Sequence, residues 1–354
     1  MPFTPEELER YSRQTRLPEF GVEGQERLRS ARVLIVGAGG LGAPASLYLA
    51  AMGVGTIGII DDDRVAPSNL PRQILFRDKD ISRPKAEVAK ERLSEVSPNT
   101  AIVTFNERLT PPNALERLRG FDLVLDGTDN FSTRYLINDA CLVLGVPLLS
   151  ASILKFEGQL AVLCTKSGPC YRCLFPEMPE PGTVPSCAEA GVIGALAGVM
   201  GTMMAMEAVK IVTKVGVPLS GMLIYDALSG NFRRMALERD PQCAGCAVPF
   251  GERKLRESYD AAPCGANELE ISWQEWQRRS LPLVDVREAW EFSERPSPGV
   301  LIPLGSLFER MQELPREPFG VVCASGSRSL TAAALLKSKG FAAVSIRGGI
   351  RSKP

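Results

Sequence analysis

A glycine-rich segment, Gly37-x-Gly39-x-x-Gly42, follows directly after the apolar run 32–36 and precedes a small-residue helical pattern. Glycines permit a tight turn and a close approach of the backbone to a phosphate, while the next helix offers free N–H donors at its N-terminus. Asp61 ends the next apolar run about 20 residues later, where a carboxylate can accept hydrogen bonds from ribose hydroxyls. These residues predict a nucleotide site, and alone they fit a nicotinamide cofactor as well as ATP.

Charged residues beyond Asp61 favour a triphosphate. Arg72 and Lys85 follow it closely in the chain, and Asp129 comes just after an apolar run at 123–125. Ligands of doubly wound sheets bind at the carboxyl ends of the strands, where all these side chains would meet. Cations neutralise phosphates and a carboxylate can hold Mg²⁺, whereas a nicotinamide cofactor needs no such set. The sequence therefore predicts ATP and Mg²⁺ at this site.

Two cysteine pairs, Cys170-x-x-Cys173 and Cys243-x-x-Cys246, have the spacing with which paired thiolates share one tetrahedral ion. The chain has nine cysteines and no histidine, so such a site consists of four cysteines. Four thiolates indicate a closed, structural Zn²⁺ site. A redox function of the first pair fits poorly, because Cys170 does not open a helix in a thioredoxin-like unit.

Two further cysteines are candidates for sulfur chemistry. Cys187 follows a Pro- and Gly-rich stretch and precedes a helical pattern, and a helix N-terminus stabilises a thiolate; the alternative is a small buried residue. Cys323 opens a loop of small residues whose N–H groups can surround one sulfur anion, with Arg328 adding positive charge. Cys264 lies in a predicted linker, where it either relays sulfur or is a bystander.

The 354 residues contain 41 basic and 41 acidic side chains, so no bulk field favours nucleic acid or an anionic membrane. The charge-free run 190–206 is shorter than the about 20 residues that span a bilayer, and it predicts a helix buried in a core or subunit interface. No signal-peptide pattern follows Met1, and we expect a cytoplasmic protein.

Apolar runs alternate with helical patterns, which predicts an α/β protein with a doubly wound, mostly parallel sheet and a small second α/β domain. We expect an adenylating domain at 1–248, a linker at 249–268 and the second domain at 269–354. Strands are predicted at 32–36, 56–60, 101–105, 123–125, 147–150, 159–164, 282–286, 320–323 and 343–346, and a helix at 329–339.

The first domain resembles the ubiquitin-activating-enzyme superfamily, and within it the molybdopterin-synthase and thiazole sulfur-carrier adenylyltransferases. The resemblance rests on Tyr11-Ser12-Arg13-Gln14, the glycine loop, Ser68-Asn69-Leu70-x-Arg72-Gln73, Pro84-Lys85, Thr128-Asp129-Asn130 and Cys170-x-x-Cys173. It implies that ATP contacts come from Gly37, Gly39, Gly40, Gly42, Asp61, Ser68, Asn69, Leu70, Arg72, Gln73, Lys85, Asp129 and Asn130. Arg72, Lys85 and Asp129 would be catalytic, with Asp129 organising Mg²⁺.

The same resemblance implies a homodimer in which Arg13 reaches into the neighbouring subunit's site. It also implies that Cys187 forms a thioester or an acyl disulfide.

The second domain is similar to rhodaneses in the loop Cys323-x-Ser325-Gly326-x-Arg328. This resemblance implies a persulfide on Cys323. Ala324 stands where that family often has arginine, which argues against a small thiosulfate-like donor. The chain ends at Pro354, where such domains usually continue into a further helix, so a shortened domain is expected.

These features together predict ATP-dependent adenylation of the C-terminal glycine of a small ubiquitin-like sulfur carrier ending in Gly-Gly. Sulfur from a Cys323 persulfide would then give a C-terminal thiocarboxylate, for molybdopterin, thiamin or another sulfur-containing product. A cysteine desulfurase or another persulfide donor would supply the sulfur. The alternatives are an adenylating tRNA-modifying dehydratase of the same superfamily, a nicotinamide-dependent oxidoreductase, and a non-catalytic module that docks a ubiquitin-like protein.

Overall fold

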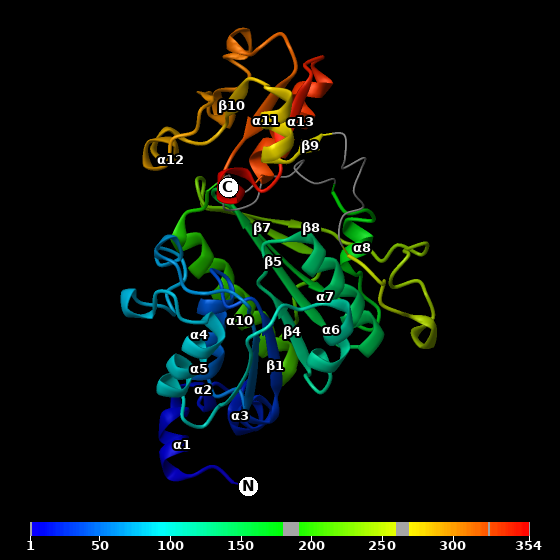
Figure 1. Ribbon diagram of the computed structural model, residues 1–354. Coiled ribbons are helices and arrows are strands. Elements are labelled where there is room, and N and C mark those ends of the chain that lie inside the picture. Colours follow the sequence, from blue (N-terminus) through cyan, green and yellow to red (C-terminus); the bar gives the residue numbers. More distant parts are fainter. Residues whose placement is uncertain (1, 180–190, 260–268, 325, 354) are drawn as a thin grey trace. The chain divides into compact units, whose positions relative to one another are not determined.

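Two hydrogen-bonded sheets organise the chain, one of eight strands and one of five (Figure 1). The structure is a computed structural model and describes residues 2–179, 191–259, 269–324 and 326–353. The chain divides into two compact units, of which the first contains residues 2–178 and 191–259 and the second contains the described residues from 269 onward. Each sheet lies in one unit.

The large sheet has the strand order β3-β2-β1-β4-β5-β6-β7-β8. Its strands are β1 (Arg32–Val36), β2 (Thr56–Ile60), β3 (Ala101–Phe105), β4 (Leu123–Asp126), β5 (Leu148–Leu154), β6 (Glu157–Leu163), β7 (Met222–Asp226) and β8 (Asn231–Met235). Strands β1 to β5 are parallel, and β6 to β8 add an antiparallel edge. The predicted α/β fold class is confirmed, although the sequence analysis did not predict β7 and β8.

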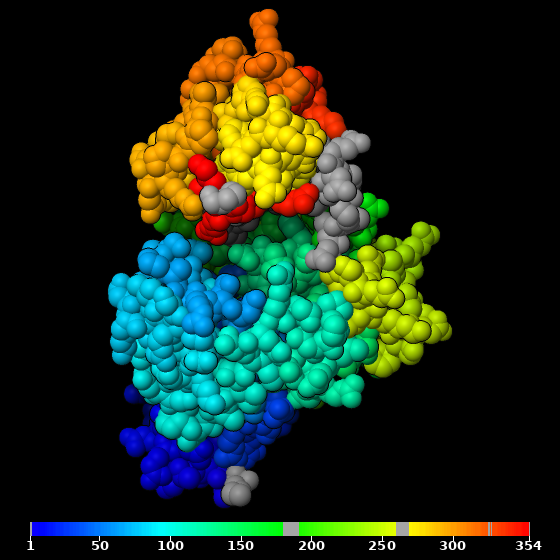
Figure 2. All heavy atoms as spheres, in the orientation of Figure 1, coloured from blue at the N-terminus to red at the C-terminus, as the bar shows by residue number. Residues whose placement is uncertain are grey.

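Helices cover both faces of this sheet because alternate residues of each central strand point to opposite sides. Val33 and Ile35 of β1 belong to one core, and Leu34 and Val36 belong to the other. The first core also takes side chains of α3 (Gly21–Ser30), α4 (Gly42–Ala51), α5 (Lys85–Val96) and α10 (Gly194–Thr213). The second takes side chains of α6 (Pro111–Leu118), α7 (Phe131–Leu144) and the short α8 (Tyr171–Leu174). In the space-filling view, cyan to green atoms of α5, α6 and α7 lie on the outside of this unit (Figure 2). Two short helices, α1 (Pro5–Arg10) and α2 (Ser12–Thr15), form the N-terminal arm.

Helix α10 contains most of the predicted charge-free run. By length and composition alone it could cross a membrane, but it packs against α4, β5 and β6. Met200, Gly201 and Met204 are buried in the first core or against it. The helix is therefore a core element, as its composition predicts.

The second unit is built on the five-stranded parallel sheet, in the order β11-β10-β12-β13-β9. Its elements are β9 (Glu270–Ile271), α11 (Trp273–Arg279), β10 (Leu283–Asp285), α12 (Ala289–Glu294), β11 (Val300–Leu301), β12 (Phe319–Val322), α13 (Ser327–Ser338) and β13 (Ala343–Ile346). Two apolar clusters flank the sheet. Cys323 directly follows the central strand β12, at its carboxyl end.

Part of the segment that the sequence assigns to a linker packs on the first unit. The Arg253 guanidinium donates hydrogen bonds to the carbonyls of Leu142 and Cys246, and Tyr259 is buried in the second core of that unit. Residues 249–259 therefore belong to the first unit, and residues 260–268 lie outside the described chain.

The close approach of α10 and α4 gives a test of this packing. A Cβ added at Gly201 would lie 2.4 Å from Pro44 Cγ and 2.5 Å from the Leu41 carbonyl oxygen, whereas one added at Gly198 meets nothing within 4 Å. We expect Gly201→Ala to lower the free energy of unfolding by about 1–3 kcal/mol through overpacking. Gly198→Ala, on the same helix, should leave it unchanged or raise it by up to about 1 kcal/mol. Urea denaturation of the two variants measures the difference, and equal stability would contradict this packing.

Candidate functional site

A cavity of about 340 Å³ opens at the carboxyl ends of the parallel strands β1, β2 and β4. It brings together nine of the residues predicted for ATP, namely Gly37, Gly39, Gly40, Asp61, Arg72, Gln73, Lys85, Asp129 and Asn130. The cavity is also lined by residues that the sequence analysis did not name, among them Asp62, Asp63, Glu107, Arg108, Thr133 and Arg134.

The glycine loop forms one wall of this cavity, between β1 and α4. Gly37 has a φ of +91°, a conformation that side chains strongly disfavour. Gly42 begins α4 and does not line the cavity, but a Cβ there would lie 1.9 Å from the Gly37 carbonyl oxygen. The third glycine of the motif therefore serves close packing of the helix on the loop.

Three charged groups meet where β2 ends. The Asp61 carboxylate accepts hydrogen bonds from the N–H groups of Ala38 (2.8 Å) and Asp63 (2.9 Å). The Lys85 ammonium, on a side chain that is only 5% exposed, lies 2.8 Å from the Asp63 carboxylate. Burial raises the pKa of Asp61, and the nearby Lys85 opposes that shift. Asp61 is thus a desolvated acceptor next to a buried cation.

Arg72 and Gln73 line the cavity and belong to a turn that is stabilised by hydrogen bonds of its own side chains. The Asn69 side chain accepts the Ala66 N–H at 3.1 Å, and the Arg72 guanidinium donates to the Ser68 carbonyl at 2.8 Å. Ser68, Asn69 and Leu70 do not line the cavity in this structure. The Gln73 side chain is buried, and its Oε1 has no hydrogen-bond partner within the described chain. An unsatisfied buried acceptor at a cavity wall indicates a site for a donor group of a ligand.

Residues 127–130, which follow β4, also line the cavity. Asp126 is buried and accepts hydrogen bonds from the Thr128 N–H, the Thr128 hydroxyl and the Ser150 hydroxyl. Asn130 caps α7 by accepting the Thr133 N–H at 2.9 Å. Asp129 lies between these anchored residues and is exposed to the cavity, where a carboxylate can serve as a Mg²⁺ ligand.

The remaining predicted residues lie elsewhere. Arg13 is exposed on α2 and does not line the cavity. Cys187 and Cys264 lie outside the described residues. The sequence analysis did not name Asp63 as a site residue. It belongs to the run Asp61-Asp62-Asp63, and side chains two positions apart at the end of a strand point to the same side, so Asp61 could have indicated it.

The four predicted metal-ligating cysteines form one cluster, with all sulfur atoms within 4.8 Å of one another. Neighbouring sulfurs are 3.9 Å (Cys170–Cys173), 3.5 Å (Cys170–Cys243) and 3.4 Å (Cys173–Cys246) apart. Tetrahedral zinc with bonds of about 2.3 Å has sulfur–sulfur edges of about 3.8 Å. Burial raises the pKa of Cys170 and raises that of Cys246 to about 11, so a cation is needed to hold these thiols as thiolates. The residues fit Zn²⁺.

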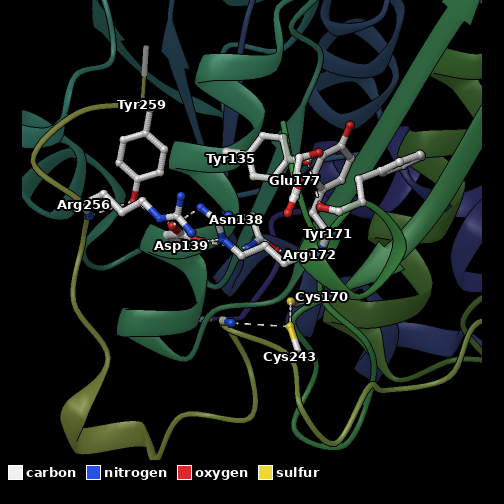
Figure 3. Close-up of polar contacts among 12 residues, drawn as sticks. Tyr135, Asn138, Asp139, Cys170, Tyr171, Arg172, Glu177, Cys243, Arg256 and Tyr259 are labelled. Carbon is white, nitrogen blue, oxygen red and sulfur yellow. Dashed lines mark hydrogen bonds and ion pairs between the residues drawn. The ribbon is translucent and has the colours of Figure 1, made fainter. Parts of the chain in front are cut away.

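A buried network connects this cluster to α7 (Figure 3). Arg172, between two of the cysteines, donates two hydrogen bonds of 2.8 Å to the Asp139 carboxylate. The Tyr259 hydroxyl donates a further one at 2.8 Å, and Asn138 accepts the Tyr171 N–H at 2.7 Å. The segment 170–173, called the cysteine knuckle below, is therefore joined to α7 by charged and neutral hydrogen bonds.

Cys323 is buried in the second unit, and its sulfur accepts the Gly326 N–H at 3.1 Å. That hydrogen bond is of the kind predicted for the loop. Arg328 forms two contacts of 2.6 Å with the Glu291 carboxylate, so its charge is balanced by an acid. Cys141 and Cys164, in the first unit, are also buried, and burial raises the pKa of both thiols.

Comparison with known proteins agrees with this division of the chain. The ThiF family profile matches residues 11–245, and the rhodanese-like domain profile matches residues 269–352. The chain belongs to the ThiF family and carries a rhodanese-like domain, so both predicted resemblances are confirmed.

Named relatives are similar over most of the chain. A sulfur carrier protein adenylyltransferase of Thermus thermophilus is 51% identical over 75% of this chain and 99% of its own length. A probable adenylyltransferase/sulfurtransferase MoeZ of Mycobacterium tuberculosis is 41% identical over 98% of this chain and 92% of its own. Escherichia coli MccB, solved with MccA-N7isoASN, has a TM-score of 0.61 at 22% identity and covers 68% of this chain and 74% of its own; at that identity it shows the fold alone.

The partly buried Asp61 gives a prediction about pH. Its pKa in the folded state lies above the ordinary 3.8. At a pH between 3.8 and that raised pKa, the folded state binds more protons than the unfolded state. The stabilisation from this group therefore rises as the pH falls through that range. We expect the stability of wild type relative to Asp61→Asn to increase as urea denaturation is moved from pH 7 down to pH 4. A difference that stays constant or decreases would contradict the assigned burial.

The cysteine cluster predicts one zinc ion per chain. Cys243→Ser should lose the metal, as measured by inductively coupled plasma mass spectrometry, and should unfold at a lower temperature because a structural zinc contributes folding energy. Cys141→Ala removes a buried thiol outside the cluster and should keep the full zinc content. Full zinc in Cys243→Ser would refute the ligand set.

Proposed function

We propose that this protein adenylates the C-terminal carboxylate of a small ubiquitin-like sulfur carrier and then converts it to a thiocarboxylate. The observation that carries the proposal is the meeting of Arg72, Lys85 and Asp129 at one cavity with the glycine loop. The names of the relatives from Thermus thermophilus and Mycobacterium tuberculosis support the same two activities.

ATP would lie with its phosphates along the glycine loop and its ribose at Asp61. Lys85 would exchange its contact with Asp63 for a phosphate oxygen, and Arg72 would balance further negative charge. Mg²⁺ held at Asp129 would neutralise the phosphates. The carrier's carboxylate attacks the α-phosphorus, pyrophosphate leaves, and an acyl-adenylate remains. No general base is needed because a carboxylate is already a nucleophile, which suits a chain without histidine.

Sulfur would come from a persulfide on Cys323, supplied by a cysteine desulfurase or another persulfide donor. The terminal sulfur attacks the acyl carbon, AMP leaves, and the carrier is joined to Cys323 through an acyl disulfide. Cys187 as a thiolate then attacks the Cys323 sulfur, which releases the thiocarboxylate and leaves a disulfide that a cellular thiol reduces.

The protein would act in the cytoplasm as a homodimer, with Arg13 completing the partner's site. Apolar side chains exposed on α3, α4 and α10 support the dimer, and α10 packs against the other two helices; these side chains are Val22, Tyr48 and Met206. The balanced charge of the chain favours neither RNA nor a membrane as a partner.

Intact-mass analysis of candidate carriers incubated with ATP and a persulfide donor tests the proposal. Wild type should exchange one carrier oxygen for sulfur, and Cys323→Ala should not, while it still catalyses ATP–pyrophosphate exchange. Inorganic sulfide, which can attack the adenylate directly, should restore thiocarboxylate formation in Cys323→Ala. Equal yields from wild type and Cys323→Ala with the persulfide donor would contradict the role of Cys323.

A further inference from the structure

Arg134 joins the Asp129 loop to the neighbouring strand. It lines the cavity, and its Nη2 donates hydrogen bonds to the carbonyl oxygens of Thr128 (2.6 Å) and Ala151 (3.3 Å). Ala151 belongs to β5, whereas Thr128 precedes Asp129 in the connection from β4 to α7. One guanidinium nitrogen therefore ties this loop to the sheet.

The Asp129 carboxylate depends on that backbone anchor. Among the described residues it makes no hydrogen bond or ion pair of its own, so no side-chain contact fixes its direction. Its neighbours on both sides are held, Thr128 by Asp126 and Arg134, and Asn130 by its cap on α7. The position of the carboxylate thus follows the position of the loop backbone.

The cysteine knuckle packs against α7, the helix that carries Arg134. Tyr171, which directly follows Cys170, donates its N–H to Asn138, four residues after Arg134 on α7 and hence on the same face. Its ring packs edge-on against Tyr135, with centroids 5.2 Å apart. These two contacts fix the knuckle to the part of α7 that carries Arg134.

We propose that Arg134 is a positioning residue for the Asp129 loop, and that the cysteine knuckle holds the part of α7 that carries Arg134 through the contacts of Tyr171 with Asn138 and Tyr135. The metal-binding cluster then does more than stabilise the fold, because its geometry is transmitted to the wall of the nucleotide cavity. The proposal rests on the proposed function where it concerns Mg²⁺, but the contacts with Thr128 and Ala151 are independent of any activity.

The alternative role of Arg134 is to bind a phosphate directly. Substitution by lysine distinguishes this role from positioning of the loop. Lysine keeps the positive charge but lacks the planar donor fork that reaches two carbonyls. Arg134→Lys should therefore behave like Arg134→Gln if the residue positions the loop, and like wild type if its charge alone matters. Arg27→Lys is a matched control, since Arg27 also donates to a backbone carbonyl, that of Thr213, away from the cavity.

Hydrogen–deuterium exchange of the peptide containing residues 127–131, without nucleotide and without carrier, measures the loop directly. We expect about tenfold faster exchange in Arg134→Lys and Arg134→Gln, and wild-type exchange in Arg27→Lys. Unchanged exchange in both Arg134 variants would overturn the proposal, even if wild type adenylates a carrier. Tyr171→Ala, which removes the ring that packs against Tyr135, should give a smaller acceleration.

The Mg²⁺ dependence of ATP–pyrophosphate exchange provides the second readout. Loss of a group that orients a metal ligand typically costs 10–100-fold, so we expect the half-maximal Mg²⁺ concentration to rise about that much in both Arg134 variants. Tyr171→Ala combined with Arg134→Gln should give no further rise, because both changes act on the same connection to the Asp129 loop. Additive effects would overturn the role of Tyr171, and a wild type inactive with every carrier would count against the proposed function alone.

Discussion

The nucleotide cavity depends on a buried cation held at the end of a parallel strand. Lys85 is enclosed by protein, and the Asp63 carboxylate 2.8 Å away balances its charge. A buried ammonium without such a partner would lose its proton or destabilise the fold. The pair keeps positive charge beside Asp61 and the glycine loop, where, in the proposed function, a nucleotide phosphate would replace the Asp63 carboxylate.

The second constraint is the cysteine cluster, whose two pairs follow the antiparallel strands β6 and β8 in the chain. Its two knuckles come from segments about 70 residues apart in sequence, so one ion would close a long loop. Arg172 and Tyr171 connect the cluster to α7 by hydrogen bonds to Asp139 and Asn138. Helix α7 thus connects the metal-binding end of the unit with the wall that carries Asp129.

Much of this could be predicted from sequence because the central strands are continuous apolar runs. The predicted bounds of β1, β2, β3 and β13 coincide with those of the structure, and β8 was missed because its side chains are exposed and show no apolar alternation. The cavity residues followed from motifs, but Arg134 did not, because its function depends on carbonyls of β5 and of the Asp129 loop that only the fold brings near. For the same reason the sequence could not show that Arg328 is paired with Glu291.

The central claim is that Arg72, Lys85 and Asp129 form a site that activates a carboxylate with ATP. ATP–pyrophosphate exchange, measured with a carrier ending in a free Gly-Gly carboxylate and with the same carrier amidated at its C-terminus, tests it most directly. The account predicts exchange only with the free carboxylate, and a loss of about 100-fold or more in Asp129→Asn. Exchange that persists with the amidated carrier, or that is unaffected in Asp129→Asn, would contradict the claim.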